Sequence, residues 1–161
     1  AYQSFSEIGI PSEERRRTAK FGYIRDAASE RDAIDFYRFL SELTADTIAY
    51  FCRGVKEFTG GKKLTGTFYG YIAANIDQDH GHHALMHLLN SGTVDFIASP
   101  NCYDWRNEPS GDWPFMSATD SVALHGGMWF AESDTRTYLS RPISECWPEI
   151  CPDNGWYDSA V

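Results

Sequence analysis

Residues 64–72 have the sequence LTGTFYGYI, in which β-branched and aromatic side chains predominate. Such side chains fit the pleated surface of a sheet, so we predict a strand here. Further strands are predicted at 94–99 (VDFIAS), which ends at Pro100, and at 122–131. Helical or loop segments separate these strands, and the polarity of the strands does not alternate strictly. Both features are typical of a parallel sheet covered by helices, the α/β class.

The clearest helix is predicted at 31–58. Its apolar side chains recur every three to five residues, the spacing of one buried helix face, at Ile34, Tyr37, Leu40, Leu43, Ile48, Phe51, Val55 and Phe58. Gly60 and Gly61 follow, and glycine readily adopts the left-handed conformation that ends a helix. A shorter helix is predicted at 81–90, between the first two strands.

We predict that residues 1–30 form an irregular, charge-rich segment that precedes the long helix. Within it, the sequence PSEE at 11–14 is typical of a helix start. We interpret the basic run at 15–17 as a solvated helix face. The chain begins at Ala1 without a targeting signal and closes with a Pro-rich tail at 140–161, so we expect a segment of a longer protein.

The composition excludes several classes of protein. The 161 residues are 42% hydrophobic and 15% aromatic, which is typical of a globular chain rather than a disordered one. No apolar run approaches the roughly 18–20 residues of a membrane span. A net charge of −9 argues against nucleic acid as a partner and favours a neutral or polyhydroxylated substrate. The cellular compartment stays open.

The cysteines are compatible with two arrangements. Cys146 and Cys151 could form a local disulfide, or all four cysteines, with Cys52 and Cys102, could be free and buried, which we favour. Because no CxxC pair is present, we predict no structural zinc site.

Three parallel strands would leave two open sheet edges. Parallel sheets are found almost only where they are covered, so either a partner supplies further strands or the chain belongs to a closed (β/α)8 barrel. The barrel is the simpler account, and we predict a partial TIM barrel over residues 31–139 of a single domain.

Catalytic groups of such barrels lie at the carboxyl ends of the strands. Glu132 directly follows the third predicted strand, where a partly desolvated carboxylate can act as a nucleophile or as an acid/base. Asp134 and Arg136 follow closely and are candidate binding residues. The alternative is that Arg136 forms an ion pair with Glu132 or Asp134 that only closes the end of the strand.

The loop after the second strand is rich in aromatic and hydrogen-bonding side chains. Tyr103 and Trp105 could stack on the apolar faces of sugar rings, while Arg106 could bind hydroxyl groups. A long loop fixed only by aromatic packing is the alternative.

Four histidines lie close together in the sequence DHGHH at 79–83 and at His87. His83 and His87 have the i, i+4 spacing of a helical metal pair, but no Glu lies between them in the HExxH manner, so we predict no metal site. We expect His87 to pack or cap, and His82 or His83 to reach the barrel mouth.

Several motifs in order resemble one known family. They are GTFYGY at 66–71, the Gly81–His82 to Leu88–Leu89 segment, VDFIASP at 94–100 with Tyr103 and Arg106, and WFAESDTRT at 129–137. Between Asp32 and Leu139 the chain resembles the catalytic barrel of glycoside hydrolases similar to the family 42 beta-galactosidases.

The resemblance implies a retaining glycosidase acting on a β-galactoside-like sugar, with no cofactor. The strands would be the fifth to seventh of the barrel, which places Glu132 at the nucleophile position and Tyr103 beside it. The acid/base Glu would follow the fourth strand, which would precede residue 1. The one Asn-Glu pair of this chain, Asn107-Glu108, lies instead in the loop after the sixth strand. We therefore expect the rest of the barrel to come from the parent protein and residues 1–161 alone to be inactive. The alternatives are a non-catalytic carbohydrate-binding barrel and a metal-dependent hydrolase built on the histidines.

Overall fold

The computed structural model describes residue 4 and residues 8–22, 24–72, 78–101 and 115–132. Its elements, in chain order, are α1 (Glu13–Arg17), α2 (Arg31–Thr59), β1 (Gly66–Phe68), the 3-10 helix η2 (Gln78–His80), α3 (Leu85–Asn90), β2 (Phe96–Pro100), α4 (Thr119–Leu124) and β3 (Met128–Glu132). The strands form one parallel sheet in the order β1-β2-β3. The predicted α/β class is therefore confirmed, and the described residues contain this small open sheet but no closed barrel.

The register of the sheet aligns the ends of the strands. Phe68 lies opposite Ala98, which lies opposite Phe130, and Pro100 at the end of β2 lies opposite Glu132 at the end of β3. Because the strands are parallel, their carboxyl ends meet at one edge of the sheet.

The third strand begins later than the sequence predicts. Val122 lies in α4, not in a strand, and β3 starts only at Met128. Gly126, with φ 75°, turns the chain between the two elements. Val122 is fully buried against the sheet from the helix side. A buried helix followed directly by a strand gives one apolar segment, which periodicity alone does not divide.

Two other predicted elements are shorter in the structure, and a glycine limits each. β1 ends at Phe68, and Gly70 beyond it has φ 83°. α3 begins only at Leu85 and not at Gly81, whose φ of 68° lies outside a right-handed helix.

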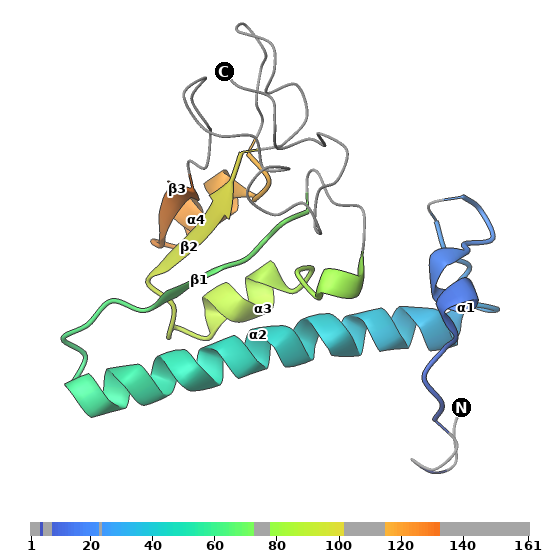
Figure 1. The fold of residues 1–161 in the computed structure, drawn as a ribbon, viewed down its shortest axis with the longest axis horizontal. Coiled ribbons are helices and arrows are strands. Elements are labelled where there is room, and N and C mark those ends of the chain that lie inside the picture. The colour runs from blue at the N-terminus through green and yellow to red at the C-terminus, as the bar shows by residue number, and fades with distance from the viewer. Residues whose placement is uncertain (1–3, 5–7, 23, 73–77, 102–114, 133–161) are drawn as a thin grey trace, which may run out of the picture.

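The long helix α2 is confirmed, and Gly60 in the left-handed conformation ends it. Its predicted buried face is only partly correct: Ile34, Tyr37, Leu40 and Ile48 are partly buried, and Ile48 packs against the core. The buried side chains of α2 are small, at Ala33, Ser41, Ala45, Ala49 and Cys52. Leu43, Phe51, Val55 and Phe58 are instead exposed. Small side chains on α2 let the short helix α3 pack closely against it (Figure 1).

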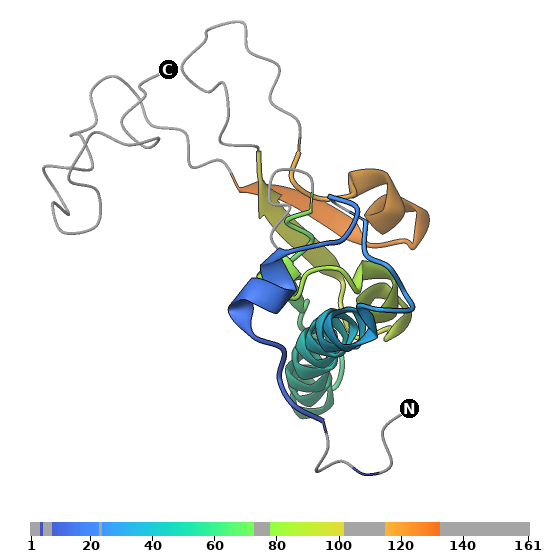
Figure 2. The same cartoon turned by 90° about the vertical axis from the view of Figure 1, so that its right-hand side faces the viewer.

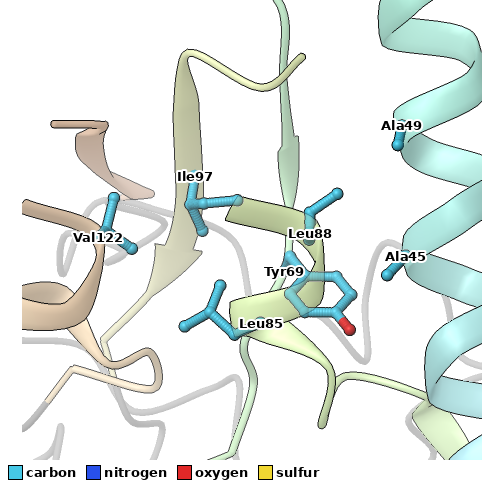
Figure 3. Packing of buried hydrophobic residues seen from close by; sticks show 7 residues of the cluster. All are labelled: Ala45, Ala49, Tyr69, Leu85, Leu88, Ile97 and Val122. Carbon is cyan, nitrogen blue, oxygen red and sulfur yellow. The ribbon is translucent and has the colours of Figure 1, made fainter. Parts of the chain in front are cut away.

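The apolar core lies between the sheet and helices α2, α3 and α4 (Figure 3). Its buried members are Ala45, Ala49, Tyr69, Leu85, Leu88, Ile97 and Val122. Cys52 of α2 is a buried free thiol, as predicted, and the other three cysteines lie outside the described residues.

The opposite face of the sheet is also apolar. The Phe96 ring occupies the space that a side chain at Gly66 would need, and it meets the Phe130 ring edge to face at 5.0 Å. Phe68, Met128 and Phe130 are 55%, 41% and 47% exposed. The helices of the described residues therefore cover one face of the sheet and leave aromatic side chains on the other.

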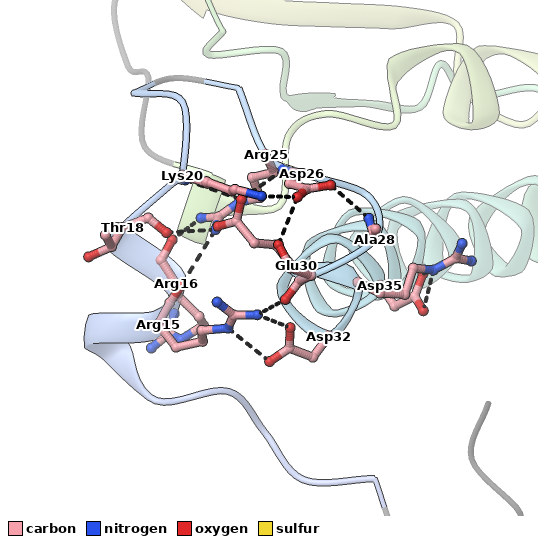
Figure 4. Close-up of polar contacts among 12 residues, drawn as sticks. Arg15, Arg16, Thr18, Lys20, Arg25, Asp26, Ala28, Glu30, Asp32 and Asp35 are labelled. Atoms are coloured by element: carbon pink, nitrogen blue, oxygen red, sulfur yellow. Dashed lines mark hydrogen bonds and ion pairs between the residues drawn. The ribbon is translucent and has the colours of Figure 1, made fainter.

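The helix α1 lies beside the start of α2 (Figure 2). Charge contacts join the N-terminal segment to α2, as Figure 4 shows for Arg15 and Asp32, and to η2. α1 starts where predicted, with the Ser12 hydroxyl accepting a hydrogen bond from the Arg15 N–H at 3.2 Å. The interpretation of 15–17 as a solvated face is only partly correct: Arg17 is exposed, but Arg15 binds Asp32 and Arg16 binds Asp79.

Candidate functional site

Glu132 closes β3 at the edge where the strands end. It is half-buried and lies opposite Pro100 of β2. Successive side chains of a strand point to opposite faces, so Glu132 shares its face with Phe130. Trp129 packs against the core on the helix-covered face. The Glu132 carboxylate therefore belongs to the face that the described helices leave uncovered.

A short segment before α4 fixes the carboxyl ends of β1 and β2. The Met116 N–H donates to the Pro100 carbonyl at 3.3 Å, and the Met116 carbonyl accepts from the Ile72 N–H at 2.9 Å. Phe115, one residue earlier, packs its ring on Trp129 at 4.4 Å. Residues 115–117 thus lie across this edge of the sheet.

His82 lies among aromatic rings just beyond β1. Its ring centroid is 4.7 Å from that of Tyr69 and 5.1 Å from that of Tyr71. Tyr69 is fully buried, and its hydroxyl donates to the Gly81 carbonyl and accepts from the Ala84 N–H, both at 3.1 Å. Packing and backbone bonds on both sides of His82 therefore fix the position of its ring.

The surroundings of His82 favour its neutral form. Burial lowers the pKa of His82 below its ordinary value, and the nearby His80 and His83 lower it further. The Tyr71 N–H donates to Nδ1 at 3.4 Å, so the proton of the neutral ring is on Nε2. His82 can thus offer a neutral N–H donor to a bound hydroxyl.

The other histidines do not form a metal pair. α3 begins at Leu85, so His83 precedes the helix and the i, i+4 argument fails. His87 Nε2 lies 2.7 Å from Asp46 Oδ1 on an exposed part of the surface. Among the described residues, no group of three or more His, Cys, Asp or Glu side chains could hold a metal ion.

Glu132 and His82 both lie near the carboxyl ends of strands, Glu132 at the end of β3 and His82 just beyond β1, with β2 between these two strands. Five other predicted site residues lie outside the described residues: Tyr103, Trp105, Arg106, Asp134 and Arg136.

The contacts that hold His82 were not predicted from the sequence. Tyr69 and Tyr71 had only been assigned to a strand, although their spacing of two around Gly70 was a usable signal that both could serve one site. The pairing of Arg16 with Asp79 was not predicted either, because these residues are 63 positions apart and share no local pattern.

In the described part of the chain, no helix is long and apolar enough to cross a membrane. Comparisons with protein-family models, with curated proteins and with solved structures each gave no significant match.

Proposed function

We propose that this chain is part of a retaining glycoside hydrolase barrel, in which Glu132 is the nucleophile. The observation that carries the proposal is the position of Glu132 at the carboxyl end of a parallel strand, on the face of the sheet that the described helices do not cover. In (β/α)8 barrels the catalytic groups come from the carboxyl ends of the strands, and the helices lie on the outside.

The uncovered sheet face supports the barrel. Phe68, Phe96 and Phe130 lie together on the face away from the helices. A barrel interior is filled by side chains from all its strands, so these rings would pack against those of the missing strands. Glu132, two residues beyond Phe130, would then lie at the top of this interior.

The proposed reaction is a double displacement. A Glu132 carboxylate oxygen bonds to the anomeric carbon while the glycosidic C–O bond breaks, and a second carboxylic acid outside this chain protonates the leaving oxygen. Water then attacks the anomeric carbon, gives its proton to that second carboxylate, and releases Glu132. His82 would donate its Nε2 proton in a hydrogen bond to a sugar hydroxyl. Tyr103, Trp105, Arg106, Asp134 and Arg136 remain candidate contacts to the sugar.

A mechanism-based label tests the role of Glu132. The full-length protein is treated with 2,4-dinitrophenyl 2-deoxy-2-fluoro-β-galactoside, which traps the glycosyl-enzyme because the fluorine slows its hydrolysis. We expect peptide mass spectrometry to find the label on Glu132. The Glu132→Gln variant should take no label, while Glu42→Gln, which removes an exposed carboxylate of α2, should be labelled like the wild type.

Azide rescue gives an independent measurement. In Glu132→Ala the small azide ion can occupy the space of the lost carboxylate, so azide should restore turnover of an aryl galactoside with formation of the α-glycosyl azide. A label on another carboxylate would contradict the assignment. A protein that binds galactose but takes no label would instead be a non-catalytic carbohydrate-binding barrel.

A further inference from the structure

The short helix α1 is attached to η2 by an ion pair. Arg16 Nη1 contacts Asp79 Oδ1, and Arg17 Nη2 lies 3.7 Å from Asp79 Oδ2. The side chains of Arg16 and Asp79 are only 21% and 25% exposed, so water screens this pair less than a fully exposed one. Asp79 therefore has a defined position relative to α1.

Helix α2 holds the same arginine from a second side. The Arg16 guanidinium lies over the Phe36 ring, 5.2 Å from its centroid. The Tyr37 hydroxyl donates to the Arg16 carbonyl at 3.3 Å, and burial, together with Asp79, raises the pKa of this phenol. Arg16 thus connects η2 to a rigid helix rather than to a loose terminus.

The backbone between Asp79 and His82 has little freedom to move. At Gly81, a side chain would lie 2.5 Å from Thr44 Oγ1 and 3.2 Å from the Leu40 carbonyl oxygen, so this backbone packs directly on α2. The Gly81 carbonyl also accepts the Tyr69 hydroxyl. The segment that leads into His82 is therefore held at two points, by Arg16 at Asp79 and by α2 and Tyr69 at Gly81, and loss of the Asp79 contact would remove one of them.

We propose that Asp79, held by Arg16, is a positioning residue for His82 at the carboxyl edge of the sheet. The proposal rests on the proposed function to the extent that His82 binds a sugar hydroxyl there. The groups around the His82 ring are Tyr69 and Tyr71 from the segment after β1, and His80 and His83 from its own segment.

The Asp79→Asn variant tests the proposal through the His82 ring itself. In the full-length protein with 13C-labelled histidine, and with His82→Gln used for assignment, the stacked tyrosines should shift the His82 ring protons upfield. The pKa of His82 should lie below its ordinary value of 6.5. In Asp79→Asn we expect the upfield shift to be lost and this pKa to rise toward 6.5, because the ring leaves its stack.

The direction in which the pKa of His82 changes distinguishes a positioning role of Asp79 from a purely electrostatic one. Removing a carboxylate without moving the ring would lower the pKa of His82 or leave it unchanged. The matched control is Asp46→Asn, which removes the exposed partner of His87 and should not alter the His82 resonances. Arg16→Gln should reproduce Asp79→Asn, whereas Arg16→Lys, which keeps the charge, should retain the stack.

A purely structural role would give a different result. If the thermal midpoint fell in Asp79→Asn and Arg16→Gln while the His82 resonances stayed unchanged, the proposal would be overturned. Because this readout needs no sugar, it is separate from the labelling of Glu132. A failed label with displaced His82 resonances would refute the glycosidase and leave the positioning role supported.

Discussion

Gly70 has a backbone conformation that most residues avoid, at a point where two segments approach closely. Its φ is 83°, and a Cβ atom there would lie 2.6 Å from the Ser117 hydroxyl oxygen. Residues 115–117 cross the ends of β1 and β2 at this point. Glycine is therefore required both for its conformation and for its lack of a side chain.

Replacing Gly70 by alanine should destabilise the fold by about 1–3 kcal/mol, since left-handed strain and steric overlap both contribute. Gly126→Ala is the matched control, because Gly126 has φ 75° but open space around it. It should cost only the strain, about 1 kcal/mol. Chemical denaturation measures both values. Adding Ser117→Ala to Gly70→Ala should recover the steric part, and no recovery would contradict this account.

The position of Glu132 in the fold was easier to predict from the sequence than that of His82. Glu132 directly follows an apolar segment, and this position alone predicts the carboxyl end of a strand, whatever the arrangement of the sheet. His82 had several histidine neighbours and no pattern to separate it from His83. Its contacts with Tyr69 and Tyr71 depend on the bend at Gly70, which no propensity specifies.

Asp95 connects three elements at the opposite end of the sheet. Its carboxylate accepts from the Thr65 N–H at 2.7 Å and from the Thr65 hydroxyl at 3.2 Å, and it contacts the Lys56 ammonium of α2. These bonds hold the pKa of Asp95 below its ordinary value of 3.8, with Lys56 as the largest cause. Asp95 thus ties the end of α2 and the start of β1 to β2.

The pH dependence of stability should reveal this contact. Because the folded-state pKa is lowered, the contribution of Asp95 is complete above about 3.8 and is lost as the pH falls through the folded-state pKa. Asp95→Asn should cost about 1–3 kcal/mol at pH 7. Urea unfolding should show the gap to wild type narrowing toward pH 2. Asp35→Asn, which breaks an exposed pair with Arg31, should cost much less at either pH.

Elements were predictable where local signals agreed. α2 combines a long apolar period with Gly60 at its end, and both of its bounds were found to within a residue. Its buried face was found only in part, because the choice between small and large side chains depends on how closely α3 packs. The boundary between α4 and β3 was not predicted, because Val122 of α4 and Trp129 of β3 are both apolar and both pack in the core.

The sheet as a whole has two outer strands among the described residues. The Tyr69 N–H donates to Ala98 and the Thr65 carbonyl accepts from Phe96, so Thr65 and Tyr69 direct their backbone groups toward β2. In a parallel strand this direction alternates, so the Phe68 N–H points away from β2. A neighbouring strand in a barrel would bind that N–H.

Amide hydrogen exchange of the full-length protein tests whether β1 has such a neighbour. If the barrel is complete, the Phe68 amide should exchange as slowly as the Tyr69 amide, which is bonded to Ala98. The measurement requires residue-level resolution, by NMR or by fragmentation mass spectrometry. Rapid exchange at Phe68 beside a protected Tyr69 would mean that β1 is a true edge strand, and the barrel would be wrong.

The mode of attachment of α1 makes the molecule sensitive to dissolved salt. α1 buries no side chain, and ion pairs such as those of Arg15 and Arg16 carry much of its contact with the rest of the chain. The screening length falls from about 10 Å at 0.1 M to about 3 Å at 1 M ionic strength. Concentrated salt should thus weaken the more exposed pair of Arg15 with Asp32 before the partly buried pair of Arg16 with Asp79, while the apolar core stays intact.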